Sequence, residues 1–224
     1  MFMCHGSVIE FFIEEIRADE FKDKLVLEIG SKYANGSVRP LIERFIFPRN
    51  YLGVDIEPGK YVDIVLNSEN LLDHFRPDSF DVVISTELLE HVSNWQLVVN
   101  NMKTLLKPAG YMYITTRSWG FPFHAYPYDF WRFEVDDMKN IFSDFEIIRL
   151  GKDHEFPGIF LKCRKPNEWK SKNLDDIALY SMILGRRTID AHKVTEMPLT
   201  RKARLAGIGL GRHVFKFANS LLKP

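Results

Sequence analysis

Short apolar runs alternate with stretches of helical periodicity along most of this 224-residue chain, and this alternation constrains the fold more than any other feature. Seven runs are predicted to be strands because they are short, apolar and bounded by turn residues. They are residues 24–29, 51–56, 61–66, 80–85, 111–116, 145–150 and 158–163. Helical spacing of apolar residues predicts helices over residues 7–21, 37–47, 92–106 and 135–142. The pattern predicts an α/β fold, a mostly parallel seven-stranded sheet with helices on both faces.

Charge divides the chain into two parts. Residues 164–224 hold 13 of the 30 Lys and Arg residues but only 5 of the 30 Asp and Glu residues. We therefore predict a core domain, residues 1–165, and a basic C-terminal extension, residues 166–224. Apolar residues lie between the basic residues of 201–224, which leaves three interpretations. We favour packing on the acidic core, either within one chain or across a homodimer. Peripheral contact with a membrane surface comes second, and contact with nucleic acid is the third.

Composition also bears on location and partners. The two cysteines are too few for a disulfide framework. No apolar run approaches the roughly 18 residues of a membrane helix, and no basic segment precedes the first apolar residues as in a signal peptide. These features predict a cytoplasmic protein. The acidic core disfavours nucleic acid as a partner, and the seven histidines lack HxxxH or HxH spacing, which predicts that no metal is required.

Residues that follow the first two predicted strands point to a nucleoside ligand, because ligands of parallel sheets bind at the carboxyl ends of the strands. Gly30 allows a sharp turn and a close ligand approach. Gly36 precedes a helix whose free N–H groups favour polar ligand groups. Asp55 ends the second strand, where a carboxylate can accept hydrogen bonds from both ribose hydroxyls. Together these residues predict that the chain binds a nucleoside.

The nature of the first loop narrows the choice of nucleoside. A dinucleotide site requires GxGxxG, whereas Lys32 stands at the second glycine position. Glu28, at the end of the first strand, would repel a pyrophosphate and suits a ligand with an amine or a positive charge. S-adenosylmethionine carries an amine and a sulfonium. Two alternatives stay open at this point: an NAD-type oxidoreductase on a similar sheet, and a non-catalytic nucleotide-binding protein.

Four segments, in this order, resemble the motifs of the class I S-adenosylmethionine-dependent methyltransferases, and most closely the subgroup called type 11. They are LEIGSKYANGSVRP from Leu27, GVDIEPGKYVDIV from Gly53, SFDVVISTELLEHV from Ser79 and LKPAGYMYITT from Leu106. The resemblance covers residues 25–150. It implies a Rossmann-like class I methyltransferase fold, S-adenosylmethionine as cofactor and methyl transfer as the reaction.

The resemblance also implies roles for individual residues. Glu28 and Gly30 correspond to positions near the methionine moiety, Asp55 to the ribose-binding acid, and Asn67 to a residue that contacts the adenine amino group. The cofactor-binding residues implied are Glu28, Gly30, Ser31, Gly36, Asp55, Ile56, Asn67, Ser68, Ser85 and Glu87. His91 and Glu90 belong to the same shared motif, and we interpret both as structural residues at the start of a helix.

An aromatic segment, residues 121–133 with Trp119 just before it, follows the fifth predicted strand. Pro122 and Pro127 argue against a regular helix there, so the segment is predicted to be a loop that walls the substrate site and excludes water. We predict that Tyr126, Tyr128 and Arg132 bind the substrate, whereas Trp131 and Phe133 fill the end of the core. Aromatic faces stack well on sugar rings. A similar segment in type 11 relatives linked to glycan biosynthesis favours a saccharide acceptor, with other small molecules left open.

Methyl transfer to a hydroxyl oxygen needs a base, because a neutral hydroxyl is a poor nucleophile. A histidine titrates near neutral pH and suits this role. His124 lies in the aromatic segment and is the predicted catalytic base. Asp129 is predicted to be catalytic as well, either by orienting the imidazole of His124 or by acting as the base itself.

Overall fold

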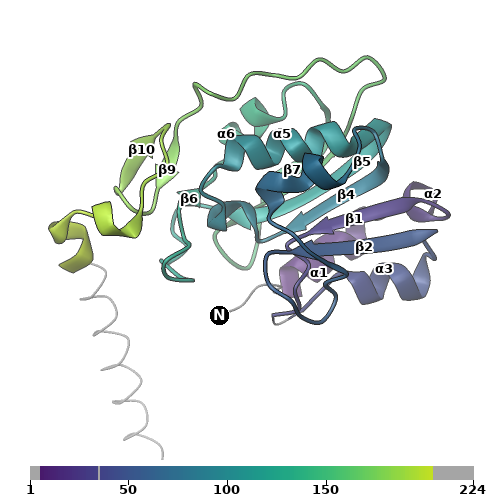
Figure 1. The fold of residues 1–224 in the computed structure, drawn as a ribbon, viewed down its shortest axis with the longest axis horizontal. Coiled ribbons are helices and arrows are strands. Elements are labelled where there is room, and N and C mark those ends of the chain that lie inside the picture. The colour runs from purple at the N-terminus through teal and green to yellow at the C-terminus, as the bar shows by residue number, and fades with distance from the viewer. Residues whose placement is uncertain (1–5, 35, 204–224) are drawn as a thin grey trace, which may run out of the picture.

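The computed structural model describes residues 6–34 and 36–203, and its centre is a seven-stranded sheet (Figure 1). The strand order is β3-β2-β1-β4-β5-β8-β7. The strands are β1 Leu25–Ile29, β2 Asn50–Asp55, β3 Ile64–Val65, β4 Phe80–Thr86, β5 Leu106–Arg117, β7 Glu146–Lys152 and β8 Gly158–Arg164. The first five pair in parallel, and β8 runs antiparallel to both β5 and β7. The predicted seven-stranded, mostly parallel sheet is thus confirmed.

Helices cover both faces of the sheet, as predicted (Figure 1). One face packs against α1 Gly6–Glu15, α2 Ala18–Phe21 and α3 Arg39–Phe45, through a cluster that includes Phe12, Phe21 and Ile42. The other face packs against α4 Leu71–His74, α5 Trp95–Leu105 and α6 Val135–Ile141. Because each sheet face is buried under helices, central strands such as β1 and β4 are largely apolar on both sides, which is the pattern seen in the sequence.

Helix boundaries differ from the predicted ones for local reasons. The helix predicted over 7–21 is two helices, because Arg17 between them has extended backbone angles, φ −117° and ψ 136°. The helix predicted over 92–106 begins later, at Trp95, because the Asn94 side chain caps it by accepting a hydrogen bond from the Leu97 N–H at 3.2 Å. The third strand is shorter than predicted, with only Ile64 and Val65 paired to β2.

A second, three-stranded antiparallel sheet was not predicted. It consists of β6 Trp131–Arg132, β9 Leu179–Ser181 and β10 Arg186–Thr188, in the order β10-β9-β6. Strands of two or three residues are too short to show alternation, so the sequence gives no signal for them. The sheet joins residues 166–203 to the domain, and Leu174 and Ile177 lie in the main core.

The predicted boundary after residue 165 therefore remains a prediction, with the described part of 166–203 packed on the domain. Residues 204–224, nearly all of the basic segment 201–224, lie outside the described residues, so its dimer and membrane interpretations also remain predictions. Among helices in the described ranges, none has the length and apolar character needed to cross a membrane.

Gly53 on β2 provides a test of how tightly the sheet packs below the ligand loops. A Cβ at this position would lie 2.1 Å from the carbonyl oxygen of Tyr61 and 2.6 Å from the Oγ of Ser31. We expect Gly53→Ala to lower the free energy of unfolding by about 3 kcal/mol, since backbone must move to admit the methyl group. Urea unfolding measures the change.

Gly151→Ala on β7 is the matched control. The nearest atoms to a Cβ there belong to the flexible Arg149 side chain, at 3.7 Å. We expect this variant to unfold within about 0.5 kcal/mol of the parent protein. Equal stabilities for the two glycine variants would contradict the packing around Gly53.

Candidate active site

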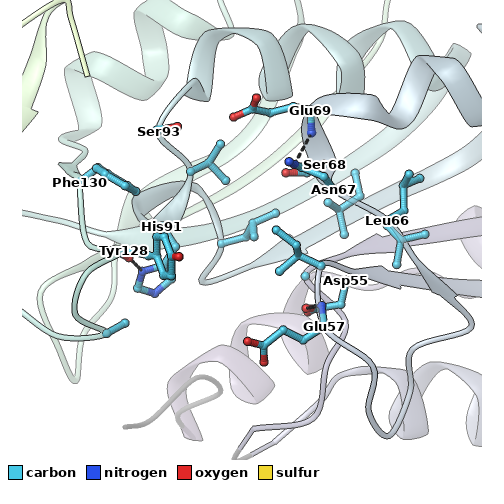
Figure 2. A pocket seen from close by; sticks show the side chains of 17 residues that line it. Asp55, Glu57, Leu66, Asn67, Ser68, Glu69, His91, Ser93, Tyr128 and Phe130 are labelled. Carbon is cyan, nitrogen blue, oxygen red and sulfur yellow. Dashed lines mark hydrogen bonds between the residues drawn. The ribbon is translucent and has the colours of Figure 1, made fainter. Parts of the chain in front are cut away.

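A cavity of about 470 Å³ opens at the carboxyl ends of β1, β2 and β4 (Figure 2). This is the edge of a parallel sheet at which ligands are expected, and the volume suits a small-molecule or cofactor site. Six predicted site residues line it: Gly30, Asp55, Ile56, Asn67, Ser68 and Tyr128. The other lining residues are Ile29, Val54, Glu57, Leu66, Glu69, Leu88, His91, Val92, Ser93, Ala125 and Phe130.

Gly30 and Asp55 shape the floor of the cavity. Gly30 has φ +80°, a conformation that favours glycine, and a Cβ there would meet Leu88 at 3.2 Å. The Asp55 carboxylate is half-buried and organises the neighbouring loops, because it accepts hydrogen bonds from the backbone N–H groups of Lys32 and Glu57, both at 3.0 Å. A carboxylate oxygen has more than one lone pair, so Asp55 can accept further hydrogen bonds from a ligand in the cavity.

Asn67 and Ser68 lie across the cavity from His91 and Tyr128 (Figure 2). The side-chain oxygen of Asn67 accepts a hydrogen bond from the Glu69 N–H at 3.0 Å and caps the 3-10 helix η1, Ser68–Asn70. This bond fixes the side chain of Asn67 at the rim of the cavity. Ile56 and Leu66 add apolar surface to the same wall.

Four of the other predicted cofactor residues lie outside the cavity wall, and three of these are buried on β4 or just after the ends of β1 and β4. Ser31, Ser85 and Glu87 are almost completely buried, and Gly36 lies in the loop before α3. Glu87 forms an ion pair with Arg117, which is also buried. Burial and the nearby Glu90 raise the pKa of Glu87 to about 8, although Arg117 opposes the shift. The cofactor roles of these residues remain predictions.

Glu28 faces away from the cavity. Alternation along β1 places Leu27 and Ile29 in one core and Val26 in the other, and Glu28 shares the side of Val26. Its carboxylate accepts a hydrogen bond from the Tyr51 hydroxyl at 2.8 Å. Burial raises the pKa of Glu28 from 4.5 to about 7, and the Tyr51 hydrogen bond only partly offsets it. Glu28 therefore lies beneath the ligand loop, and its cofactor contact remains a prediction.

The raised pKa of Glu28 gives a pH-dependent stability. Between about pH 4.5 and pH 7 the unfolded chain loses this proton while the folded protein keeps it, so folding stability falls as pH rises through that window. Glu28→Gln removes the ionisation and should be more stable, relative to the parent, at about pH 8 than at about pH 4. Urea unfolding at both pH values measures the difference. Glu146→Gln, at an exposed position on β7, is the control that should show no such change.

His124 and Asp129 meet in the aromatic loop, which we define as residues 118–130. No helix or strand forms in it, as the two prolines predicted. The Asp129 carboxylate accepts a hydrogen bond from the backbone N–H of His124 at 2.7 Å. The same carboxylate lies 3.1 Å from the ring Nδ1 of His124. It also pairs with Arg132 at 2.6 and 2.8 Å. Despite burial, these partners lower the pKa of Asp129 to about 2, so it is ionised and orients the imidazole.

The three predicted substrate residues occupy different environments. Arg132 is buried, and besides Asp129 its guanidinium donates to the carbonyl oxygens of Phe121, Pro122 and Trp131. Through these hydrogen bonds Arg132 holds the aromatic loop in place. A contact between Arg132 and the substrate remains a prediction. The rings of Tyr126 and Tyr128 are 74% and 64% exposed and can meet a ligand. Trp131 and Phe133 are buried in the core, as predicted.

His91 is a site residue that the sequence reasoning did not select. It ends the 3-10 helix η2, Leu89–His91, lines the cavity, and contacts the His124 ring with centroids 4.7 Å apart. Its Nδ1 lies 2.5 Å from the carbonyl oxygen of Tyr128. The neighbouring Glu90 is fully buried and accepts from the Thr116 hydroxyl at 2.9 Å. The signal for His91 was its position in the segment that follows the fourth strand, at the sheet edge where ligands bind.

Comparison with solved structures places this fold among known ones. A chain of the complex between the Haloferax volcanii Trm112 methyltransferase activator and a methyltransferase is similar at TM-score 0.58 and 13% identity, over 72% of this chain and 90% of that one. The Burkholderia thailandensis 1,6-didemethyltoxoflavin-N1-methyltransferase has TM-score 0.51 and 12% identity, over 65% and 72%. The [4+2]-cyclase SpnF has TM-score 0.55 and 13% identity, over 72% and 81%.

At these identities the likenesses show the fold alone, and the cyclase among them illustrates why chemistry needs separate support. Comparison with curated proteins finds no match. The sequence itself matches a family model, described as a methyltransferase domain, over residues 7–157. That match covers most of the chain and includes the ligand loops described above. The chain therefore belongs to the methyltransferase domain family, and it is a class I methyltransferase that uses S-adenosylmethionine as its cofactor.

Proposed function

We propose that this methyltransferase methylates an oxygen of a small molecule, with a saccharide as the favoured acceptor. One observation carries the proposal. The oriented His124–Asp129 pair lies in contact with His91, which lines the cavity together with the exposed ring of Tyr128. A proton acceptor and an aromatic surface thus meet at one end of the cavity, opposite the residues suited to a nucleoside (Figure 2).

The other end of the cavity fits the cofactor. When bound, S-adenosylmethionine supplies an activated methyl group on a sulfonium, and the protein supplies position and a dry site. Asp55 would accept hydrogen bonds from the ribose hydroxyls, and Asn67 would accept one from the adenine amino group. Gly30, which lacks a Cβ, leaves room for close approach at the end of β1. These assignments follow from the donor and acceptor groups that face the cavity.

The acceptor chemistry follows from the state of His124. Ionised Asp129 accepts a hydrogen bond from the Nδ1–H of His124, which leaves a lone pair on Nε2. That nitrogen can take the proton of an acceptor hydroxyl as its oxygen bonds to the methyl carbon. S-adenosylmethionine, held by Asp55 and Asn67, would supply that methyl group and would take up the electron pair of its carbon–sulfur bond. Asp129 stabilises the imidazolium that forms, while Arg132 holds Asp129 in place.

Exposed aromatic rings favour a saccharide. Trp119, Tyr126 and Tyr128 are each at least 60% exposed, and all three belong to the aromatic loop. Trp119 is braced edge-on by Tyr180 of β9, with ring centroids 4.3 Å apart. Flat rings fixed near a cavity offer the faces that sugar C–H groups pack against. The same rings could also contact another small molecule, which is the second acceptor class.

Direct assay tests this proposal. Calorimetry with S-adenosylmethionine and S-adenosylhomocysteine first establishes donor binding by the full chain. Turnover is then followed by mass spectrometry with free sugars, sugar nucleotides and phenols as acceptors. We expect a methylated sugar hydroxyl. Methylation confined to nitrogen or carbon acceptors would overturn the proposed base chemistry, and methylation of phenols alone would overturn the saccharide.

Tyr126→Ala tests the aromatic surface. We expect the acceptor KM to rise about tenfold, which corresponds to about 1.4 kcal/mol of lost stacking, with donor affinity unchanged. Tyr33→Ala is the matched control, because Tyr33 is an exposed tyrosine in the loop after β1, outside the aromatic loop. An unchanged acceptor KM in Tyr126→Ala would remove this ring from the acceptor site.

A further inference from the structure

Three metal-ligating side chains meet where η2 touches the aromatic loop. Glu90 and His91 come from η2, and His124 comes from the loop. One ligand atom from each lies within 4.8 Å of the other two. The separation between His91 Nε2 and Glu90 Oε1 is 3.8 Å. His124 is distant in sequence from Glu90 and His91, because all of β5 lies between them. The fold alone brings the three side chains together.

Both imidazoles are held so that their Nε2 atoms are available as ligands. His91 Nδ1 lies 2.5 Å from the Tyr128 carbonyl oxygen, which can only accept, so this nitrogen carries the proton. His124 Nδ1 lies 3.1 Å from ionised Asp129, so the same assignment holds. Metal-binding histidines characteristically donate their second ring N–H to a carbonyl or carboxylate. Here the Tyr128 carbonyl oxygen and the Asp129 carboxylate are these acceptors.

An unpaired buried oxygen of Glu90 supports a ligand at this place independently of the two imidazoles. Its side chain is fully buried, with one oxygen accepting from Thr116, while Oε1 has no hydrogen-bond partner among the described residues. His91 Nε2 is likewise buried and without a hydrogen-bond partner in the described part of the chain. Leaving a buried carboxylate oxygen unpaired costs free energy, and a cation between these atoms would offset that cost.

We propose that Glu90, His91 and His124 form a binding site for a divalent ion of the zinc type. Two imidazoles and one carboxylate suit Zn²⁺ and Co²⁺, whereas Mg²⁺ and Ca²⁺ prefer oxygen ligands throughout. Bonds of about 2.0–2.1 Å in a tetrahedral site place ligand atoms about 3.3 Å apart. The present separations reach that spacing with side-chain shifts of about 1 Å or less. Three protein ligands leave a fourth position free.

Binding of the ion does not depend on the proposed function, but its consequence does. A metal bound to Nε2 of His124 withholds that nitrogen from proton transfer. Zinc is then expected to slow methylation and a chelator to restore it. The unloaded protein stays active in this account, which agrees with the prediction that no metal is required.

The test is metal binding by the chelator-treated full chain. Calorimetry with Zn²⁺ should show one tight site, and Co²⁺ should give the intense visible absorption of a low-coordinate ion. Glu90→Gln and His124→Gln should each weaken Zn²⁺ binding on the order of 100-fold, and Asp129→Asn about 10–100-fold through the outer shell. His154→Gln, at an exposed histidine, is the control that should bind as the parent does.

Two results would overturn the site: no stoichiometric Zn²⁺ binding, or equal affinity in the parent, Glu90→Gln and His124→Gln. Thermal unfolding and S-adenosylhomocysteine binding verify that each variant is folded. If buried Glu90→Gln does not fold, His124→Gln in the loop carries the test. Tight zinc binding without inhibition would leave the metal site standing and remove His124 as the base. Absence of zinc binding would leave methyl transfer untouched.

Discussion

His124→Gln is expected to slow the methyl-transfer step by about 10²–10⁴-fold, the usual contribution of a positioned general base. Glutamine can keep a hydrogen bond to Asp129 through its side-chain amide, so the aromatic loop should stay in place. It cannot take up a proton at neutral pH. Donor affinity should change little, because His124 is not among the residues that line the nucleoside end of the cavity.

The rate is best measured in single turnovers at saturating donor and acceptor, since product release then does not mask chemistry. Both proteins are treated with chelator beforehand, so that a difference reports proton transfer and not a bound metal. His154→Gln is the matched control for loss of a histidine. A His124→Gln enzyme as fast as the parent would show that the acceptor loses its proton to another group.

Asp55→Ala is expected to weaken S-adenosylhomocysteine binding by about 10²–10⁴-fold. Hydrogen bonds to a charged group contribute about 1.5–3 kcal/mol each, and Asp55 is proposed to accept two from the ribose. The same carboxylate also anchors the N–H groups of Lys32 and Glu57, so its loss loosens two loops of the cavity floor. Calorimetry with the demethylated product measures the effect without turnover.

Asp73→Ala on α4 is the control, because Asp73 is an exposed acid outside the cavity. Asp55→Asn should fall between the parent and Asp55→Ala, since it keeps one acceptor oxygen but loses the charge. Parent-like binding by Asp55→Ala would show that the donor does not bind through this residue, even though the fold and family stay as described.

The fold was largely predictable because its determinants are local. Five consecutive strands pair in parallel, with helices between all of them except β2 and β3, so apolar runs and turn residues mark them in the sequence. Gly30, Asp55 and Asn67 were predictable for the same reason: each lies at or just after the carboxyl end of a strand, at the ligand edge of the sheet. Short pairings such as β6 with β9 carry no such signal.

The proposed acceptor end was less predictable because contacts between distant segments form it. His91 and His124 are far apart in sequence, so no spacing rule could join them, and their ring contact exists only in the folded chain. For Glu28 the strand was predictable, but the side of the sheet that its side chain faces was not. Its position was correctly placed on a strand, but a residue on a strand buried on both sides can face either core, and it faces Tyr51.

The pairing of β6 with β9 brings two separate stretches of chain together beside the proposed acceptor site. Residues 7–157 match the family model, yet the aromatic loop is tethered from outside that range, where the Met182 N–H donates to the Phe130 carbonyl at 2.7 Å and Tyr180 braces Trp119. If the aromatic loop binds the acceptor as proposed, changes in residues 166–203 alter acceptor choice while the donor half stays constant. Related enzymes could thus differ in product through substitutions in residues 166–203 alone, with the methyl-transfer reaction unchanged.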